Sequence, residues 1–427
     1  MQTTRDVAET LLQKARTLAP VLRQRAAATN QARRIPGETI QDFWDAGLWY
    51  LLKPKKFGGP ELRPDVALAV ASELSRGDGS AGWIWAVFTI HDLLVALWPE
   101  EFQREYWAKN TLSASSFAPS GKATPANGGY RVSGKWTFCS GVDNADWLLL
   151  GTFFGPPSGG SPIPDIRYVM IPKGEAKVID DWFVIGLRGT GSKGVVVDNV
   201  FVPNHRIQGL AEMIQGTTPG SRVHDSPLYK APVWAIIPFT ISSPANGMAR
   251  GGLDAFIDEM KVREGSYDHS PLAKKPGIQL TVAEASATID AAELLYWRSF
   301  RETIDKIMAG EPLSLEHRAR NRRDQGFSVM MAKQAAEKLF TATAGRGLYE
   351  GNHVQRAYAD LHALQGHIVA GWEMPPPPAA ESTPAVTQPP AVLARRPDAP
   401  PPPQASEKPP KPKEKKGFFK RLLGVFK

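Results

Sequence analysis

"GKWTFCSGVDNADWLLLG", residues 134–151, decides what kind of structure the middle of this chain forms. Its Trp, Phe, Val and Leu residues come in short runs, and Gly, Asn and Asp separate the runs. Aromatic and β-branched residues favour strands, whereas Gly, Asn and Asp favour turns. The same texture recurs in "DIRYVMIP" (165–172) and "GLRGTGSKGVVVDNVFVP" (186–203). The sequence therefore predicts an antiparallel β-domain over residues 111–210.

Helical patterns lie on both sides of this region. "RDVAETLLQKARTLAPVLRQRAAA" (5–28) and the Ala-rich stretch 280–310 space their apolar residues three and four apart, as an amphipathic helix does. The order α, β, α predicts an α+β fold. We expect a helical N-terminal domain at 1–110, a β-domain at 111–210, a connecting loop region at 211–243 and a helical C-terminal domain at 244–373. A Pro-rich disordered linker at 374–416 and a terminal peptide at 417–427 would follow.

Composition narrows the class of protein. Of the 427 residues, 42% are hydrophobic and 22% charged, which suffices for a sizeable core. The net charge of +8 is concentrated in the tail from Met374, which holds ten Lys/Arg and four Asp/Glu. The preceding part carries 41 Lys/Arg against 39 Asp/Glu and is nearly neutral. We therefore expect no nucleic-acid partner.

The tail combines a linker with an amphipathic end. Residues 374–416 are rich in proline and contain no aromatic residue, so they cannot bury enough surface to fold. "EKKGFFKRLLGVFK" (414–427) alternates Phe, Leu and Val with Lys and Arg and is far too short to span a bilayer. It could dock on an anionic membrane surface, in a partner protein or in a protein shell.

Cysteine content and hydropathy bear on location. Cys139 is the single cysteine, which excludes an internal disulfide framework and agrees with a reducing compartment. No run of about 18 apolar residues occurs, and the N-terminus lacks the apolar stretch of a secretory signal. The expected location is cytoplasmic, with membrane-peripheral or compartment association through the terminal peptide.

No metal site is expected, because the Glu-x-x-His at 350–353 has no second copy.

Three stretches together resemble a known family. Segments 134–151, 186–203 and "QRAYADLHALQGH" (355–367) are similar to the two-component flavin-dependent monooxygenases of the acyl-CoA dehydrogenase fold. This group includes the oxygenase components of hydroxyphenylacetate hydroxylase, the steroid-ring hydroxylase and dibenzothiophene monooxygenase. The resemblance covers roughly residues 5–373. It implies a helical N-terminal domain, a central antiparallel β-barrel, a C-terminal four-helix bundle and a homotetramer.

The resemblance also implies a reaction and its participants. A separate flavin reductase would supply reduced FMN or FAD, which reacts with O₂ to give a C4a-(hydro)peroxyflavin. That species would oxygenate a small aromatic or heteroaromatic substrate. It must be kept from losing H₂O₂ by a hydrogen-bond donor near flavin N5 and by a dry pocket.

Several residues match positions that handle flavin in this family. Ser140 offers a hydroxyl near N5, and the neighbouring Cys139 could occupy that place instead; a plain β-turn is the alternative. Thr190 and Ser192 lie on the Gly-rich segment 188–194, which would line the flavin and substrate, or would form only a hairpin. Arg263 would reach the flavin phosphate, or would form a surface ion pair.

Two histidines are candidates for catalysis. His91 lies in the apolar run "WAVFTIHDLLVALW" and is either a hydrogen-bonded core residue or placed over the substrate. His367 follows Asp360 by seven residues, which puts both near one face of a helix, while His362 lies about 140° away. An imidazole there could accept a phenolic proton or donate a hydrogen bond to the peroxide.

Glu350 supports a rival function. "LYEGNHVQR" resembles the acyl-CoA dehydrogenases, whose catalytic glutamate in a Tyr-Glu-Gly turn removes the α-proton of a thioester. In the monooxygenase alternative, Glu350 only places charge near a helix N-terminus. A third alternative is a non-catalytic flavin-fold scaffold tethered through the terminal peptide. The monooxygenase is the preferred hypothesis, because segments 134–151 and 188–194 and His367 favour it.

Overall fold

The structure is a computed structural model that describes residues 4–156 and 164–371. Contacts divide the chain into a unit spanning Met1–Ala380 and a second unit spanning Glu381–Lys427. The predicted linker 374–416 and terminal peptide 417–427 lie outside the described residues. Within the described part, no helix is long and apolar enough to cross a membrane.

Helices form both ends of the described chain. The longer helices are α1 Thr4–Ala32, α2 Gly37–Asp45, α3 Pro64–Gly77, α4 Gly79–Val95, α5 Glu100–Tyr106, α6 Leu210–Gln215, α7 Ile237–Val262, α8 Pro276–Met308, α9 Leu315–Thr343 and α10 His353–Gln365. Between them lie the strands β1 Ser113–Ala126, β2 Gly129–Cys139, β3 Trp147–Gly155, β4 Asp165–Pro172, β5 Lys177–Ile179, β6 Lys193–Pro203 and β7 Ile207–Gly209. The predicted order of a helical part, a β-part and a second helical part is confirmed.

The strands form one seven-stranded sheet in the order β5-β6-β2-β1-β3-β4-β7. All pairings are antiparallel except that of β1 with β3, which is parallel. The chain returns from the β1–β2 hairpin to the other edge of β1, so β3 runs in the direction of β1. No pairing joins β5 to β7 among the described residues. The expected central antiparallel β-barrel is thus a mainly antiparallel sheet with one parallel pairing, and its edge strands β5 and β7 do not pair with each other among the described residues.

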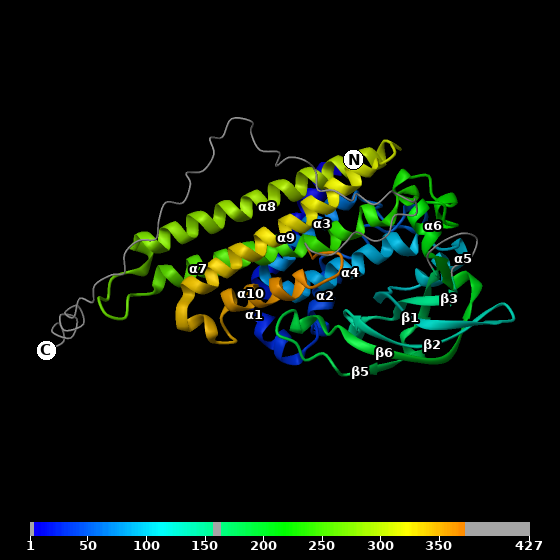
Figure 1. The fold of residues 1–427 in the computed structure, drawn as a ribbon, viewed down its shortest axis with the longest axis horizontal. Helices are drawn as coiled ribbons and strands as arrows, with labels where there is room; N and C mark the ends of the chain where they lie inside the picture. The colour runs from blue at the N-terminus through cyan, green and yellow to red at the C-terminus, as the bar shows by residue number, and fades with distance from the viewer. Residues whose placement is uncertain (1–3, 157–163, 372–427) are drawn as a thin grey trace, which may run out of the picture. The chain divides into compact units, whose positions relative to one another are not determined.

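Helix α4 lies between the sheet and the helices. Every residue from Gly79 to Val95 is buried, and α4 packs against α3, α7 and β1 (Figure 1). Asp78 begins the helix by accepting a hydrogen bond from the Ser80 N–H. Gly82 permits the close approach of α3, because a Cβ there would lie 1.9 Å from Ser75 Oγ. The site described below is built on this helix.

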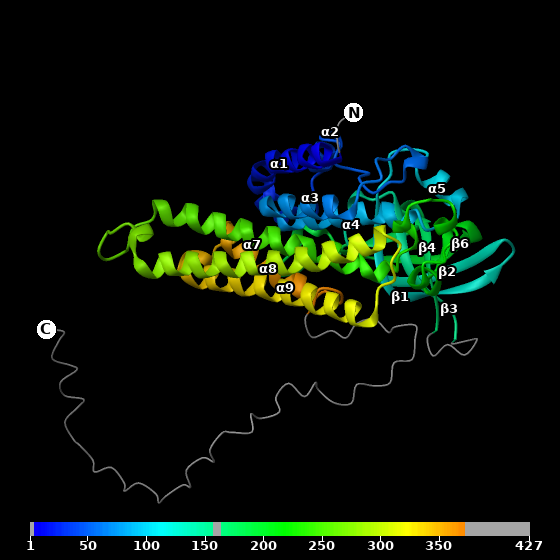
Figure 2. The ribbon, with the colours of Figure 1, turned by 90° about the horizontal axis from the view of Figure 1, so that it is seen from above.

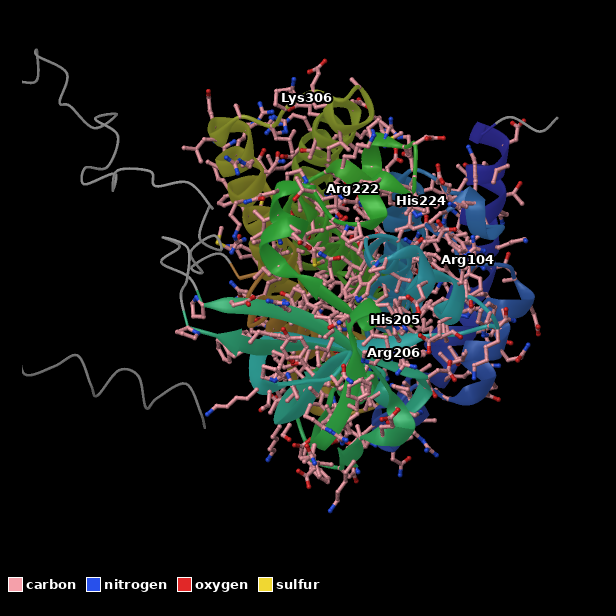
Figure 3. All side chains as sticks on the ribbon, turned by 90° about the vertical axis from the view of Figure 1, so that its right-hand side faces the viewer. Arg104, His205, Arg206, Arg222, His224 and Lys306 are labelled. Atoms are coloured by element: carbon pink, nitrogen blue, oxygen red, sulfur yellow. The ribbon has the colours of Figure 1, made fainter. Side chains whose placement is uncertain are left out.

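The remaining helices cover α4 from two sides. Figure 2 shows α1 and α3 along one side and α7, α8 and α9 along the other. Helix α7 contacts α3, α8, α9 and α10. At the sheet, Glu105 of α5 accepts bonds from Arg206 and from His205 (3.1 Å), which lie between β6 and β7 (Figure 3). These contacts fix the sheet against the N-terminal helices.

Candidate active site

Trp83 joins two of the predicted site residues. It lies on α4 with only 4% of its surface exposed. Its indole Nε1 donates to Ser140 Oγ at 3.3 Å. Its ring meets the His367 ring edge-to-face, with the centroids 5.3 Å apart. The sequence patterns did not single out Trp83, which was expected to be a core residue or part of an aromatic wall.

Ser140 is held in a constrained segment at the end of β2. Phe138 has a φ of 61°, which is rare for an aromatic residue, and Gly141 has a φ of 76°. The Gly141 N–H donates to the Thr190 carbonyl at 2.9 Å. A Cβ on Gly141 would come within 2.6 Å of the Phe88 ring. The Ser-Gly pair thus closes a turn and also fixes the Ser140 hydroxyl against α4.

The hydroxyls of three predicted residues form a chain. Ser140 Oγ lies 2.8 Å from Ser192 Oγ, and Ser192 Oγ lies 2.7 Å from Thr190 Oγ1. Thr190 Oγ1 donates to the carbonyl of Leu187 at 2.8 Å. Because a hydroxyl has one proton, Ser192 then donates to Thr190 and Ser140 donates to Ser192. We call Trp83, Ser140, Ser192, Thr190 and His367 the Trp83 cluster.

His367 lies beyond the helix on which it was expected. Helix α10 ends at Gln365, and His367 occupies the following turn. Its Nδ1 accepts a hydrogen bond from the Val369 N–H at 3.3 Å. Burial lowers the pKa of His367 to about 4, so the imidazole is neutral near pH 7. With Nδ1 accepting, Nε2 carries the proton and can donate it in a hydrogen bond.

The neighbouring candidates on α10 serve other contacts. His362 Nε2 lies 2.8 Å from Glu337 Oε1, and its Nδ1 lies 2.7 Å from the Tyr358 carbonyl. Asp360 is buried and accepts from the Leu187 N–H rather than facing His367. The shared helix face expected for Asp360 and His367 does not occur, because the helix ends between them.

His91 and Cys139 are buried away from solvent. Nδ1 of His91 lies 2.7 Å from the Ser113 carbonyl, and its Nε2 lies 3.0 Å from Ser115 Oγ. Burial lowers the pKa of His91 to about 4 and raises that of Cys139 to about 12. Cys139 is fully buried at the end of β2, whereas Ser140, the first residue after the strand, meets Trp83. His91 could reach a substrate only by exchanging one of these two bonds.

Arg263 and Glu350 both form ion pairs. Arg263 Nη1 donates to Glu259 Oε1 at 2.7 Å and to the Thr343 carbonyl at 3.2 Å. Glu350 has 86% of its side chain exposed and lies 3.3 Å from Arg188 Nη1. The N-terminus of α10 is capped by the Asn352 side chain and not by Glu350. The Glu350 carboxylate is therefore exposed to solvent and is not enclosed in a pocket.

An apolar surface beside the hydroxyl chain suits a planar ring. Phe138 is 65% exposed and packs edge-to-face on Trp182, with the centroids 5.9 Å apart. Phe183 and Ile185 are also exposed. Trp182 Nε1 donates to the Leu187 carbonyl at 3.2 Å, so the Phe138–Trp182 pair lies beside the carbonyl end of the hydroxyl chain. In contrast, no group of three or more His, Cys, Asp or Glu residues in the described ranges could hold a metal ion.

The family comparisons agree with this fold. The family described as acyl-CoA dehydrogenase, N-terminal domain, matches residues 5–115, and the family described as acyl-CoA dehydrogenase, C-terminal domain, matches residues 239–372. The crystal structure of 3-HSA hydroxylase from Rhodococcus sp. RHA1 superimposes with a TM-score of 0.78 at 34% identity, covering 85% of this chain and 93% of that one. The chain is thus a protein of the acyl-CoA dehydrogenase fold.

Curated relatives define the family further. The chain is 35% identical to the FADH(2)-dependent resorcinol hydroxylase, oxygenase component, of Rhizobium sp. strain MTP-10005, over 83% of this chain and 89% of that protein. It is also 35% identical to the flavin-dependent monooxygenase, oxygenase subunit HsaA, of Rhodococcus jostii strain RHA1, over 83% and 93%. The chain belongs to the oxygenase components of two-component, reduced-flavin-dependent monooxygenases.

The lowered pKa of His367 predicts how stability depends on pH. A histidine in the unfolded chain titrates near 6.5, whereas the folded pKa is about 4. Between these values the unfolded chain binds more protons, so acidification destabilises the fold. The buried His91 contributes in the same direction, and the buried Asp78, Asp92 and Asp360, whose pKa values are raised, oppose it.

We therefore expect His367→Gln to lose less stability than the wild type between pH 7 and about pH 5, because glutamine does not titrate. Urea unfolding of the flavin-free protein at both pH values measures the difference. Equal losses in the two proteins would contradict a neutral, partly buried imidazole.

Proposed function

We propose that the Trp83 cluster is the active site at which this oxygenase hydroxylates a small phenol. The enzyme uses reduced flavin, and its two-component class implies a reductase partner and an aromatic substrate. Relatives are named for resorcinol, p-hydroxyphenylacetate and indole-3-acetate, which are small aromatic compounds. The observation that carries the proposal is the contact of Trp83 with both Ser140 and His367.

A bound reduced flavin would supply the two electrons with which one atom of O₂ enters an aromatic C–H bond while the other leaves as water. The chain supplies a matching polar edge. Ser140 accepts from Trp83 and donates to Ser192, which leaves one lone pair free. That lone pair suits the N5–H of a reduced flavin. Donation from Ser140 to flavin would require its bond to Ser192 to be exchanged.

His367, which contacts the Trp83 ring, adds a hydrogen-bond donor to this polar edge. Its Nε2–H has no hydrogen-bond partner among the described residues, so it is free to donate to an oxygen of the substrate or of the activated oxygen. Thr190 and Ser192 line the flavin edge through the hydroxyl chain. Arg263 reaches a flavin phosphate if it exchanges Glu259 for phosphate oxygens.

The first test compares single-site variants. His367→Ala should retain reduced-flavin binding but lose hydroxylation by roughly 10²-fold or more, because an acid–base or hydrogen-bonding group is lost. Ser140→Ala should increase the share of O₂ released as H₂O₂. Glu350→Gln is the matched control and should cost far less. Product and H₂O₂ are measured with a flavin reductase, NADH, FAD or FMN, and a panel of phenols that includes resorcinol.

The opposite pattern would overturn the proposal. If Glu350→Gln abolished activity, His367→Ala retained it, and the protein oxidised an acyl-CoA with an artificial electron acceptor, the Tyr-Glu-Gly turn would hold the base. If no variant bound reduced flavin and the wild type did not either, the scaffold alternative would remain.

We also propose that the chain forms a homotetramer through its helical C-terminal domain. Leu280 and Leu294 are large apolar side chains exposed on α8, and helices that pair in water bury such residues. Sedimentation equilibrium should give about four times the chain mass of 46.6 kDa. Replacing both leucines with Glu should lower the assembly state, whereas a wild-type monomer would rule the tetramer out.

Finally, we propose that the terminal peptide 417–427 locates the enzyme and takes no part in the chemistry. Its Lys and Arg residues would each add about 1 kcal/mol of attraction to an anionic lipid surface. Deletion after Glu373 should therefore leave the hydroxylation rate unchanged and abolish vesicle binding. Co-sedimentation with phosphatidylserine vesicles at low and high salt measures it. A full-length protein that ignores these vesicles at low salt would exclude the membrane and leave a partner protein or shell.

A further inference from the structure

Leu187 connects α10 to the hydroxyl chain through its own backbone. It is buried and has a φ of 53°, a conformation that a leucine rarely adopts without support. Its N–H donates to Asp360 Oδ1 at 2.6 Å. Its carbonyl accepts from the Thr190 N–H (3.1 Å), Thr190 Oγ1 (2.8 Å) and Trp182 Nε1 (3.2 Å). The Leu187 carbonyl is one end of the hydroxyl chain. Its position therefore depends on the hydrogen bond between the Leu187 N–H and Asp360.

The carboxyl group of Asp360 has little freedom to move. Its Oδ2 faces the first turn of α4, where a Cβ on Gly79 would lie 2.7 Å away. Next to it, Gly186 lies so close to α10 that a Cβ would come within 2.0 Å of the Ala359 carbonyl. The segment 186–187 is thus clamped against α10 by contact as well as by the hydrogen bond. A shorter or a longer side chain at position 360 would shift Leu187.

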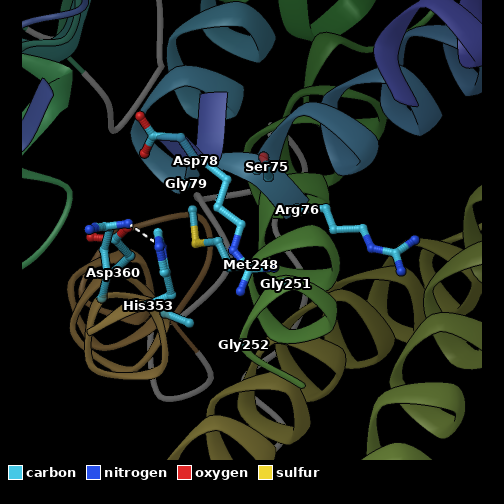
Figure 4. A pocket seen from close by; sticks show the side chains of 13 residues that line it. Ser75, Arg76, Asp78, Gly79, Met248, Gly251, Gly252, His353 and Asp360 are labelled. Atoms are coloured by element: carbon cyan, nitrogen blue, oxygen red, sulfur yellow. Dashed lines mark hydrogen bonds between the residues drawn. The ribbon is translucent and has the colours of Figure 1, made fainter. Parts of the chain in front are cut away.

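Asp360 and Asp78 line one small cavity (Figure 4). Arg356 lines the same cavity. Arg356 lies one turn earlier on α10 and is 5% exposed; its Nη1 lies 2.8 Å from His353 Nδ1. Its positive charge opposes the effect of burial, which raises the pKa of Asp360 to about 6. The cavity between these side chains measures only about 20 Å³, too small for a flavin or an aromatic substrate. Asp360 can therefore act on the reaction only through the protein.

We propose that Asp360 is a positioning residue for oxygen chemistry: by holding the Leu187 N–H, it fixes the carbonyl that orients the hydroxyls of Thr190, Ser192 and Ser140. The inference rests on the proposed role of Ser140 at the flavin. It links α10, α4 and the loop before β6 in one hydrogen-bonded path that ends at Trp83. Loss of Asp360 releases the far end of this path, and the Ser140 proton is then no longer directed to Ser192.

The test is a single turnover without aromatic substrate. Enzyme in excess over reduced FAD is mixed with O₂, and the rate of H₂O₂ release is measured. Asp360→Ala should raise this rate by about tenfold or more, as Ser140→Ala does, because small displacements in an active site have large effects on rate. Asp360→Asn retains an acceptor oxygen for the Leu187 N–H and should stay within about twofold of the wild type. The double variant Ser140→Ala/Asp360→Ala should release H₂O₂ no faster than Ser140→Ala alone.

The variant Asp360→Glu distinguishes the position of the carboxylate from its charge. It also serves in place of Asp360→Ala if the alanine variant does not fold. It retains a negative charge near Arg356 but moves the carboxylate by one methylene, so it should also raise the rate. Wild-type rates in both Asp360→Ala and Asp360→Glu, or multiplied effects in the double variant, would overturn the inference about Asp360 alone. An unchanged rate in Ser140→Ala would instead overturn the role of the hydroxyl chain, and the inference with it.

Discussion

The complete burial of α4 is the constraint on which the site depends. A helix with no solvent-facing side can pair its polar side chains only with neighbouring elements, and an unbonded buried donor costs about 1–3 kcal/mol. Ser80, Trp85 and Thr89 of α4 have side-chain polar atoms without a partner among the described residues, whereas Trp83 and His91 do find partners. Trp83 donates to Ser140 after β2, and His91 bonds Ser113 and Ser115 of β1. The same bonds that satisfy the helix attach the sheet to it. The position of Ser140 is thus set by the core and not by the loop in which it lies.

The hydroxyl chain has a direction because one end is a carbonyl and the other an indole. A carbonyl only accepts and an indole N–H only donates, so each hydroxyl between Leu187 and Trp83 has one possible orientation. Such a chain polarises its members in the same sense. The free lone pair of Ser140 can therefore only accept a hydrogen bond. This arrangement favours a donor such as the N5–H of reduced flavin over the bare N5 of the oxidised form.

Local patterns in the sequence predicted the turns and the residues in them. They did not predict contacts between residues that lie far apart in the sequence. Ser140, Thr190 and Ser192 belong to Gly-containing turns between strand patterns, so they could be recognised individually. Trp83 could not be distinguished from the other aromatic residues of α4, because a helix buried on every side has no apolar stripe. The bond of Asp360 to Leu187 spans 173 residues and leaves no periodic signal. The end of α10 before His367, however, was readable from Gly366, a common helix stop.

Glu350 and His367 represent two possible reactions of this fold, proton removal from a C–H bond and oxygen transfer. The two residues differ in how far they are buried. A carboxylate that removes a C–H proton needs a raised pKa, which requires desolvation. Glu350 instead is exposed to solvent and forms an ion pair with Arg188. His367 is held against Trp83, where burial keeps the imidazole neutral and leaves its Nε2–H available. Neutral donors suit a reaction in which oxygen is transferred and water must be excluded. The proposed oxygen chemistry therefore rests on the buried surroundings of Trp83 and not on the exposed Tyr-Glu-Gly turn.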